Sequence, residues 1–106
     1  MKVICNNPLY LNELKKEFNA KTPNMQIITH DDMDGYASGA VVFHTFKNAG
    51  IISDNTCSIN HYNYSDKIPT IDKSADIIFI TDYSISNETF MNDLLNVYEN
   101  NNQLIF

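Results

Sequence analysis

A group of metal-binding residue types lies at the junction between an apolar run and a segment of small residues. The β-branched run Ile27–Thr29 ends in His30. Asp32 and Asp34 follow at alternate positions, and Gly35 comes next. Alternate residues of an extended chain point to the same side, so the histidine and both acids would share one side. One imidazole with carboxylates is a donor set for Mn²⁺, Mg²⁺ or a similar divalent cation rather than for thiolate-bound zinc.

The same residues also allow a plainer interpretation. An Asp-Gly pair is typical of a polar turn, and Asp34 could cap the helix expected to follow. However, a second acidic residue, Asp82, follows another apolar run. Acidic side chains that gather at strand ends repel one another and cost folding free energy unless a cation lies among them. The two acidic strand ends favour a metal site, with helix capping as the alternative for Asp32, Asp34 and Asp82.

Two segments of the chain resemble motifs of the DHH phosphoesterase family. His30-x-Asp32-x-Asp34-Gly35-x-x-Ser38 is similar to the first motif of that family. Ile77–Ser84 is similar to the second motif, an apolar strand that ends in a metal-bridging aspartate, here Asp82. The order and spacing of the two motifs also agree. The resemblance covers the chain from about Gln26 to its last residue.

The resemblance implies a two-metal hydrolase that acts on phosphodiesters. His30, Asp32 and Asp82 would hold one Mn²⁺ or Mg²⁺ ion, and Asp34 with Asp82 would contribute to a second. In such a centre two ions about 3.5–4 Å apart hold the phosphoryl group and activate a water molecule as the nucleophile. The three aspartates would be the catalytic residues. The expected substrate is a nucleotide or short nucleic acid: a short oligonucleotide, single-stranded nucleic acid or a cyclic dinucleotide.

The neighbouring polar and aromatic residues are given other roles. Asp31 occupies a variable position of the motif and is expected to be solvated, while Ser38 would brace the turn. A packing or surface role is expected for His61. Tyr62 and Tyr64 could stack a base, as aromatic residues do in single-strand-binding proteins. An amphipathic strand explains these two tyrosines equally well, so we leave them out of the predicted site.

The Asp-His-His segment that names the family is missing from residues 1–106. In the family it follows the strand after the second-motif helix, at about the position of Phe106 here. A further aspartate motif and a separate substrate-binding domain come after it. We therefore interpret residues 1–106 as a single partial domain, the N-terminal half of a DHH catalytic domain. Because the second ion would lack ligands, we expect weak or single metal binding and little turnover from this chain alone.

Composition restricts the class of protein further. A chain of 106 residues forms one domain at most, and 43% hydrophobic with 19% charged residues is typical of a globular protein. The net charge of −6 argues against a broad nucleic-acid-binding surface, although bound cations would locally reverse the field. We expect no membrane association and a cytoplasmic location, because no apolar run is long enough to span a membrane and Met1–Pro8 lacks a signal-peptide pattern.

Strand and helix patterns alternate, which predicts an α/β fold. Apolar runs predict strands at residues 25–29, 57–64, 77–81 and 103–106. Periodic apolar residues predict helices at residues 8–18, 36–48 and 87–100, the last capped by Ser86, and a single helical turn at residues 71–75. The expected architecture is a parallel sheet flanked by helices, a Rossmann-like three-layer sandwich and a truncated DHH domain.

The helical patterns also predict which residues are buried. The helix at residues 36–48 is apolar around most of its circumference, which predicts burial on more than one side, with Gly35 and Gly39 allowing close approach to the sheet. Its expected core residues are Ala37, Ala40, Val41, Val42, Phe43 and Phe46. In the helix at residues 87–100 the inward-facing residues are expected to be Phe90, Met91, Leu94, Leu95 and Tyr98.

A non-enzymatic function is the alternative. The unfinished sheet would leave Leu104–Phe106 as an open apolar edge, and such edges pair with other chains. The protein could then be a truncated α/β module that binds a nucleotide or a protein partner. Self-association through the same edge is expected on this interpretation.

Overall fold

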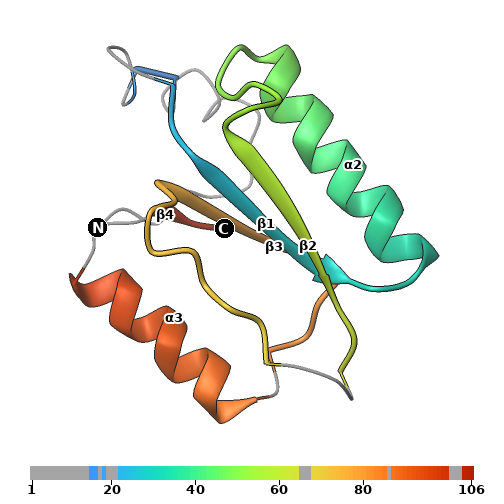
Figure 1. Ribbon diagram of the computed structural model, residues 1–106, viewed down its shortest axis with the longest axis vertical. Helices are drawn as coiled ribbons and strands as arrows, with labels where there is room; N and C mark the ends of the chain where they lie inside the picture. The colour runs from blue at the N-terminus through green and yellow to red at the C-terminus, as the bar shows by residue number, and fades with distance from the viewer. Residues whose placement is uncertain (1–14, 17, 19–21, 65–67, 86, 101–103) are drawn as a thin grey trace.

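The computed structural model describes residues 15, 16, 18, 22–64, 68–85, 87–100 and 104–106. The helix expected at residues 8–18 lies largely outside these residues. Within them, all strands are parallel and form one sheet in the order β2-β1-β3-β4 (Figure 1). The predicted α/β fold is confirmed. The described elements are β1 (Met25–His30), α2 (Met33–Asn48), β2 (Cys57–Tyr62), β3 (Ile77–Thr81), α3 (Glu88–Asn100) and β4 (Leu104–Ile105).

Helices cover both faces of the sheet, so the structure has three layers. α2 lies on one face and α3 on the other (Figure 1). Ile27 and Ile77 belong to the cluster between the sheet and α2. Ile28 and Ile78 belong to the cluster between the sheet and α3. Because neighbouring residues of the central strands are buried on opposite faces, these strands are apolar without alternation.

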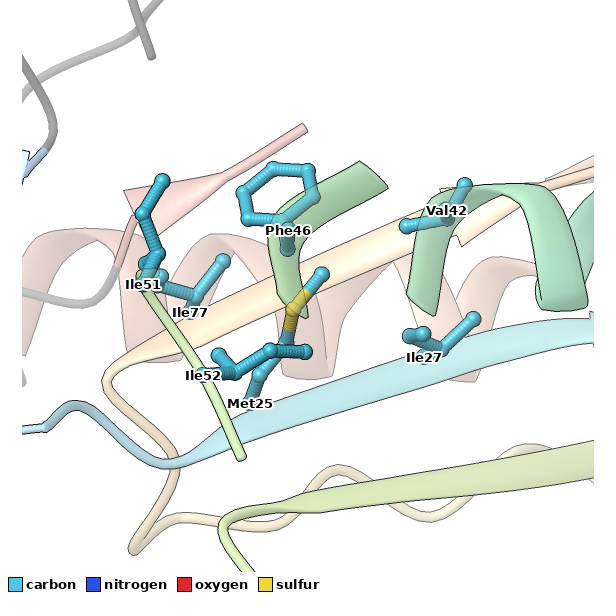
Figure 2. Packing of buried hydrophobic residues seen from close by; sticks show 7 residues of the cluster. All are labelled: Met25, Ile27, Val42, Phe46, Ile51, Ile52 and Ile77. Atoms are coloured by element: carbon cyan, nitrogen blue, oxygen red, sulfur yellow. The ribbon is translucent and has the colours of Figure 1, made fainter. Parts of the chain in front are cut away.

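Each face of the sheet has its own hydrophobic core. Figure 2 shows the cluster on the α2 side, where side chains of α2 meet those of β1, β3 and the segment after the helix: Met25, Ile27, Val42, Phe46, Ile51, Ile52 and Ile77. The cluster on the α3 side consists of Ile28, Ala75, Ile78, Phe90, Leu94 and Val97. Burying a large aliphatic or aromatic side chain contributes roughly 1.5–3 kcal/mol, so these two clusters hold α2 and α3 against the sheet.

The connections leave the two central strands in opposite directions. β1 continues through α2 to β2 on one side, and β3 continues through α3 to β4 on the other side. β1 and β3 are hydrogen-bonded neighbours, with Thr29 paired to Thr81 at the end of their ladder. This arrangement is a topological switch point, and open α/β sheets bind ligands in the crevice beyond the carboxyl ends of the strands at such a point.

α2 differs from its prediction in both its start and its burial. The helix begins at Met33 rather than at residue 36, and its N-cap is Asp32. Its buried residues lie along one stripe: Gly35, Gly39, Val42 and Phe46. Val41 is 64% exposed, and Ala37 and Ala40 are also exposed. The expectation of burial on more than one side was wrong, because a helix lying on one face of a sheet buries a single stripe.

α3 begins at Glu88, and the side-chain oxygen of Asn87 accepts a hydrogen bond of 3.1 Å from the Phe90 amide. The predicted cap, Ser86, lies outside the described residues. Three expected core residues are instead exposed: Met91 at 39%, Leu95 at 49% and Tyr98 at 37%. The buried stripe consists of Phe90, Leu94 and Val97, the last of which was not predicted.

The described residues between β2 and β3, which are 63, 64 and 68–76, form neither a helix nor a strand. β2 ends at Tyr62, two residues earlier than predicted. The helical turn expected at residues 71–75 is a tight turn, in which the Ala75 amide donates to the Asp72 carbonyl. The buried side chain of Gln26 holds this connection: its amide group donates to the Thr70 carbonyl at 2.8 Å, and its oxygen accepts from the Asp72 amide at 2.8 Å. The buried amide of Gln26 thus has partners for both its donor and its acceptor group, and these bonds hold residues 70–72 beside β1.

The last residues extend the sheet beside β3. The Phe106 amide donates to the Ile78 carbonyl, and the Phe106 carbonyl accepts from the Ile80 amide. The Phe106 ring is stacked on Phe79 at a centroid distance of 5.4 Å. Within the part of the chain that the structure describes, no helix has the length and apolar character needed to cross a membrane.

Candidate metal centre

Three of the four predicted ligands meet at the carboxyl ends of β1 and β3. His30 is the last residue of β1, and Asp82 directly follows β3. His30, Asp32 and Asp82 each offer one ligand atom, and these atoms all lie within 4.8 Å of one another. The group lies at the edge of the sheet where α2 begins (Figure 1). The parallel pairing of β1 with β3 brings together residues that are about 50 positions apart in the sequence.

His30 is oriented by the neighbouring carboxylate. Its Nδ1 atom lies 2.8 Å from Oδ2 of Asp32. The ring is largely shielded, with 22% of the side chain exposed. In the neutral tautomer that carries the proton on Nδ1, the lone pair of Nε2 is available to a cation. Metal-binding histidines are commonly held by such a contact.

Asp32 has two roles, one for each of its oxygens. Its backbone is extended, and Oδ1 accepts a hydrogen bond of 2.7 Å from the Gly35 amide, which caps α2. Oδ2 faces His30. The hydrogen bond from Gly35 lowers the pKa of Asp32, and so does His30, while burial acts in the opposite direction. The capping interpretation therefore holds for Asp32 without excluding metal binding. It is wrong for Asp34, which lies inside the first turn.

Asp82 lies in an environment that opposes its negative charge. Although the residue is exposed, partial desolvation raises the pKa of its carboxyl group. The charge of Asp32, a hydrogen bond with Asp32 and the charge of Asp34 raise this pKa further. Its backbone is also unusual: with φ of 49°, it is the one non-glycine residue in the left-handed region among those described. Residues held in this region are often functional, although Asp adopts it more readily than most. A bound cation would offset the repulsion between the carboxylates.

Asp34 lies outside the group formed by the other three ligands. It is exposed in the first turn of α2. Its charge nevertheless contributes to the raised pKa of Asp82, so it acts on the same site. Its assignment to a second ion stays a prediction.

Gly35 allows α2 to begin directly against the end of β1. A Cβ atom at this position would lie 1.8 Å from the carbonyl oxygen of His30. The hydroxyl of the fully buried Thr29 donates to the Gly35 carbonyl at 2.9 Å. Ser38 donates to the same carbonyl at 3.3 Å, so it contacts the turn rather than the ligands. These contacts fix the N-terminus of α2 beside the carboxylates of Asp32 and Asp82. The free amide groups of a helix N-terminus favour anions.

Tyrosines that the sequence did not assign to the site line one side of it. The Tyr64 ring lies 4.6 Å from the His30 ring and 4.8 Å from the Tyr83 ring, measured between centroids. The Tyr64 hydroxyl accepts a hydrogen bond of 2.9 Å from the Ser84 amide. Burial raises the pKa of Tyr83. The only sequence signal for a role of these tyrosines was the alternate spacing of Tyr62 and Tyr64. That spacing does not indicate that Tyr64 reaches the end of β3.

A second aromatic pair lies beside the start of α2. Tyr36 is stacked on His61 at a centroid distance of 3.7 Å, which agrees with the packing role expected for the histidine. The Asp31 carboxylate raises the pKa of Tyr36 by accepting a hydrogen bond from its hydroxyl and by its charge. Asp31 is exposed, as predicted, and belongs to this pair rather than to the ligand group.

The donor set fits a hard divalent cation. It combines one imidazole nitrogen with carboxylate oxygens. Among the described residues, no lysine or arginine forms an ion pair with Asp32 or Asp82. Comparisons of the chain with protein-family models, with curated proteins and with solved structures find no match. Fold and site together define an α/β domain with a candidate metal centre at its switch point.

Proposed function

We propose that this chain carries ligands of the metal centre of a metal-dependent phosphoesterase of the DHH type. The observation that carries the proposal is the meeting of His30, Asp32 and Asp82 within 4.8 Å at the carboxyl ends of two adjacent parallel strands. The resemblance of the two strand ends to the DHH motifs supports the same chemistry. We include a cytoplasmic location in this proposal.

The proposed substrate is a phosphodiester in a short oligonucleotide, in single-stranded nucleic acid or in a cyclic dinucleotide. Mn²⁺ or Mg²⁺, when bound, supplies stabilisation of negative charge on the phosphoryl group and an activated water molecule. His30, Asp32 and Asp82 hold the first ion, and Asp34 with Asp82 contributes to the second. The positive end of α2 attracts the phosphate oxygens. Because the chain carries a net charge of −6, an anionic substrate depends on the cations for its approach.

Metal affinity tests this proposal without requiring turnover. We expect the 106-residue chain to bind Mn²⁺ weakly but saturably in isothermal titration calorimetry. Asp32→Asn and Asp82→Asn should each reduce the affinity at least tenfold, because each removes a charged ligand. Asp31→Asn is the matched control, since it removes the same charge from the same loop but lies outside the ligand group. Equal binding by all four proteins would contradict the proposal.

A nucleotide titration separates an enzyme site from a simple binding module. If the proposal holds, binding of a dinucleotide requires Mn²⁺ and disappears when EDTA is added. Tight dinucleotide binding that survives EDTA would instead support the non-catalytic module.

A further inference from the structure

Tyr64 contacts both of the strand ends that carry the candidate ligands. It lies two residues beyond the end of β2. Its ring packs against the His30 ring at 4.6 Å with an interplanar angle of 36°. Its hydroxyl accepts the backbone hydrogen bond of Ser84, two residues after Asp82, at 2.9 Å. One side chain from a third segment therefore links the end of β1 to the segment that follows β3.

The contacts of Tyr64 lie beyond the last ladder pair that joins β1 to β3. The ladder between β1 and β3 ends at the pair Thr29 and Thr81, one residue before both His30 and Asp82. Beyond that pair β1 and β3 form no further ladder pair. His30 is still paired with Tyr62 of β2 before the chain enters α2, and the other segment turns through the left-handed conformation of Asp82. The distance between His30 and Asp82 thus depends on contacts made outside the ladder.

Packing in the hydrophobic core does not explain the position of Tyr64. The residue is 51% exposed, so it contributes little to the core. Tyr62 offers a direct comparison, because it is part of the packing against the α3-side core. The Tyr62 hydroxyl also accepts a backbone hydrogen bond, from Thr70 at 3.2 Å, but that residue belongs to the connection between β2 and β3 and carries no ligand.

We propose that Tyr64 is a positioning residue of the metal centre, which sets the spacing between His30 and Asp82. This inference rests on the proposed function. This role does not require Tyr64 to contact the metal ion or the substrate. It acts through His30, whose ring it orients together with Asp32, and through the Ser84 amide, which it holds so that Asp82 faces the histidine. Residues that orient metal ligands in this way commonly change metal affinity 10- to 100-fold when they are replaced.

Three variants of the 106-residue chain test the role of Tyr64. Tyr64→Phe removes the hydrogen bond to Ser84 and keeps the ring, whereas Tyr64→Leu removes both. Tyr62→Phe is the matched control, because it also removes one hydrogen bond between a tyrosine hydroxyl and a backbone amide. We expect Mn²⁺ affinity to fall several-fold in Tyr64→Phe and about tenfold or more in Tyr64→Leu. It should stay within twofold of the unmodified chain in Tyr62→Phe.

Urea denaturation in EDTA separates positioning from general destabilisation. Tyr64→Phe and Tyr62→Phe should show similar denaturation midpoints, because each loses one exposed hydrogen bond. If Tyr64→Leu does not fold, the comparison of the two phenylalanine variants decides. The inference is overturned if the unmodified chain binds Mn²⁺ and neither Tyr64 variant differs from Tyr62→Phe. An unmodified chain without Mn²⁺ binding that depends on Asp32 and Asp82 would overturn both the proposed function and this inference.

Discussion

Replacing Gly35 with alanine is expected to destabilise the protein, although alanine is normally the better helix residue. The new Cβ atom would lie 1.8 Å from the carbonyl oxygen of His30, and Cβ atoms essentially never approach other atoms closer than 3.0 Å. The His30 carbonyl and the start of α2 would therefore have to separate by at least about 1.2 Å. Such a shift breaks the buried hydrogen bond from Thr29 to Gly35. It also displaces the Gly35 amide from Asp32.

The expected cost follows from these two effects. Overpacking against backbone costs about 1–3 kcal/mol, and loss of a buried hydrogen bond costs about 1 kcal/mol more. The gain in helix propensity, about 1 kcal/mol, offsets part of this. We expect a net loss of about 1–3 kcal/mol in the free energy of unfolding, on the sum of these contributions.

Gly39→Ala is the matched control, because Gly39 is also buried in α2, one turn further on. There the nearest atom to an added Cβ is a side-chain methyl carbon of Thr29 at 3.4 Å, an ordinary contact. Gly39→Ala should therefore leave stability unchanged or raise it by up to about 1 kcal/mol. Urea denaturation in EDTA measures both variants. Equal stability of the two would refute the close packing of α2 on His30.

Two further predictions concern the core and the thiol of the described chain. Leu94 is 5% exposed and Leu95 is 49% exposed. Leu94→Ala should therefore lower the free energy of unfolding by about 2–5 kcal/mol, and Leu95→Ala by less than about 1 kcal/mol. Similar losses for the two variants in urea denaturation would contradict the burial of Leu94 rather than Leu95 against the sheet. Burial raises the pKa of the Cys57 thiol from 9.0 to about 11. Because the thiolate is the reactive form, Cys57 should react slowly in the folded protein. In a Cys5→Ser variant, alkylation of Cys57 by iodoacetamide at pH 9 should be more than about tenfold slower in the folded protein than in urea. Equal rates would contradict the burial of this thiol.

A parallel sheet covered on both faces could be predicted because the apolar runs are unambiguous. Ile27-Ile28 and Ile77-Ile78 contain adjacent apolar residues, and adjacent residues of a strand point to opposite faces, so both faces had to be covered. Parallel strands end at the same edge, which is why Asp32 and Asp82 could be placed together from the sequence alone. The structure brings these two residues and His30 together as expected.

Features that depend on the phase of a helix or on a long-range contact could not be predicted. Residues 90, 94 and 97 and residues 91, 95 and 98 have the same helical spacing, so the periodicity does not distinguish the buried stripe of α3 from its exposed neighbour. Asp32 and Asp34 are equally good capping residues, and only the extended backbone of Asp32 shows which one caps α2. No local pattern indicates that Tyr64 reaches Ser84, because the two residues are 20 positions apart and Tyr64 lies beyond the end of β2.

The location of bound Mn²⁺ tests the candidate metal centre most directly. Paramagnetic Mn²⁺ broadens the NMR signals of nearby amides, so we would titrate substoichiometric Mn²⁺ into the ¹⁵N-labelled chain. The amide signals of His30, Gly35 and Asp82 should broaden first, and those at the opposite ends of the strands, such as Met25 and Ile77, should broaden last. Asp82→Asn should abolish this order. Uniform broadening, or an unchanged pattern in Asp82→Asn, would contradict a metal centre between β1 and β3.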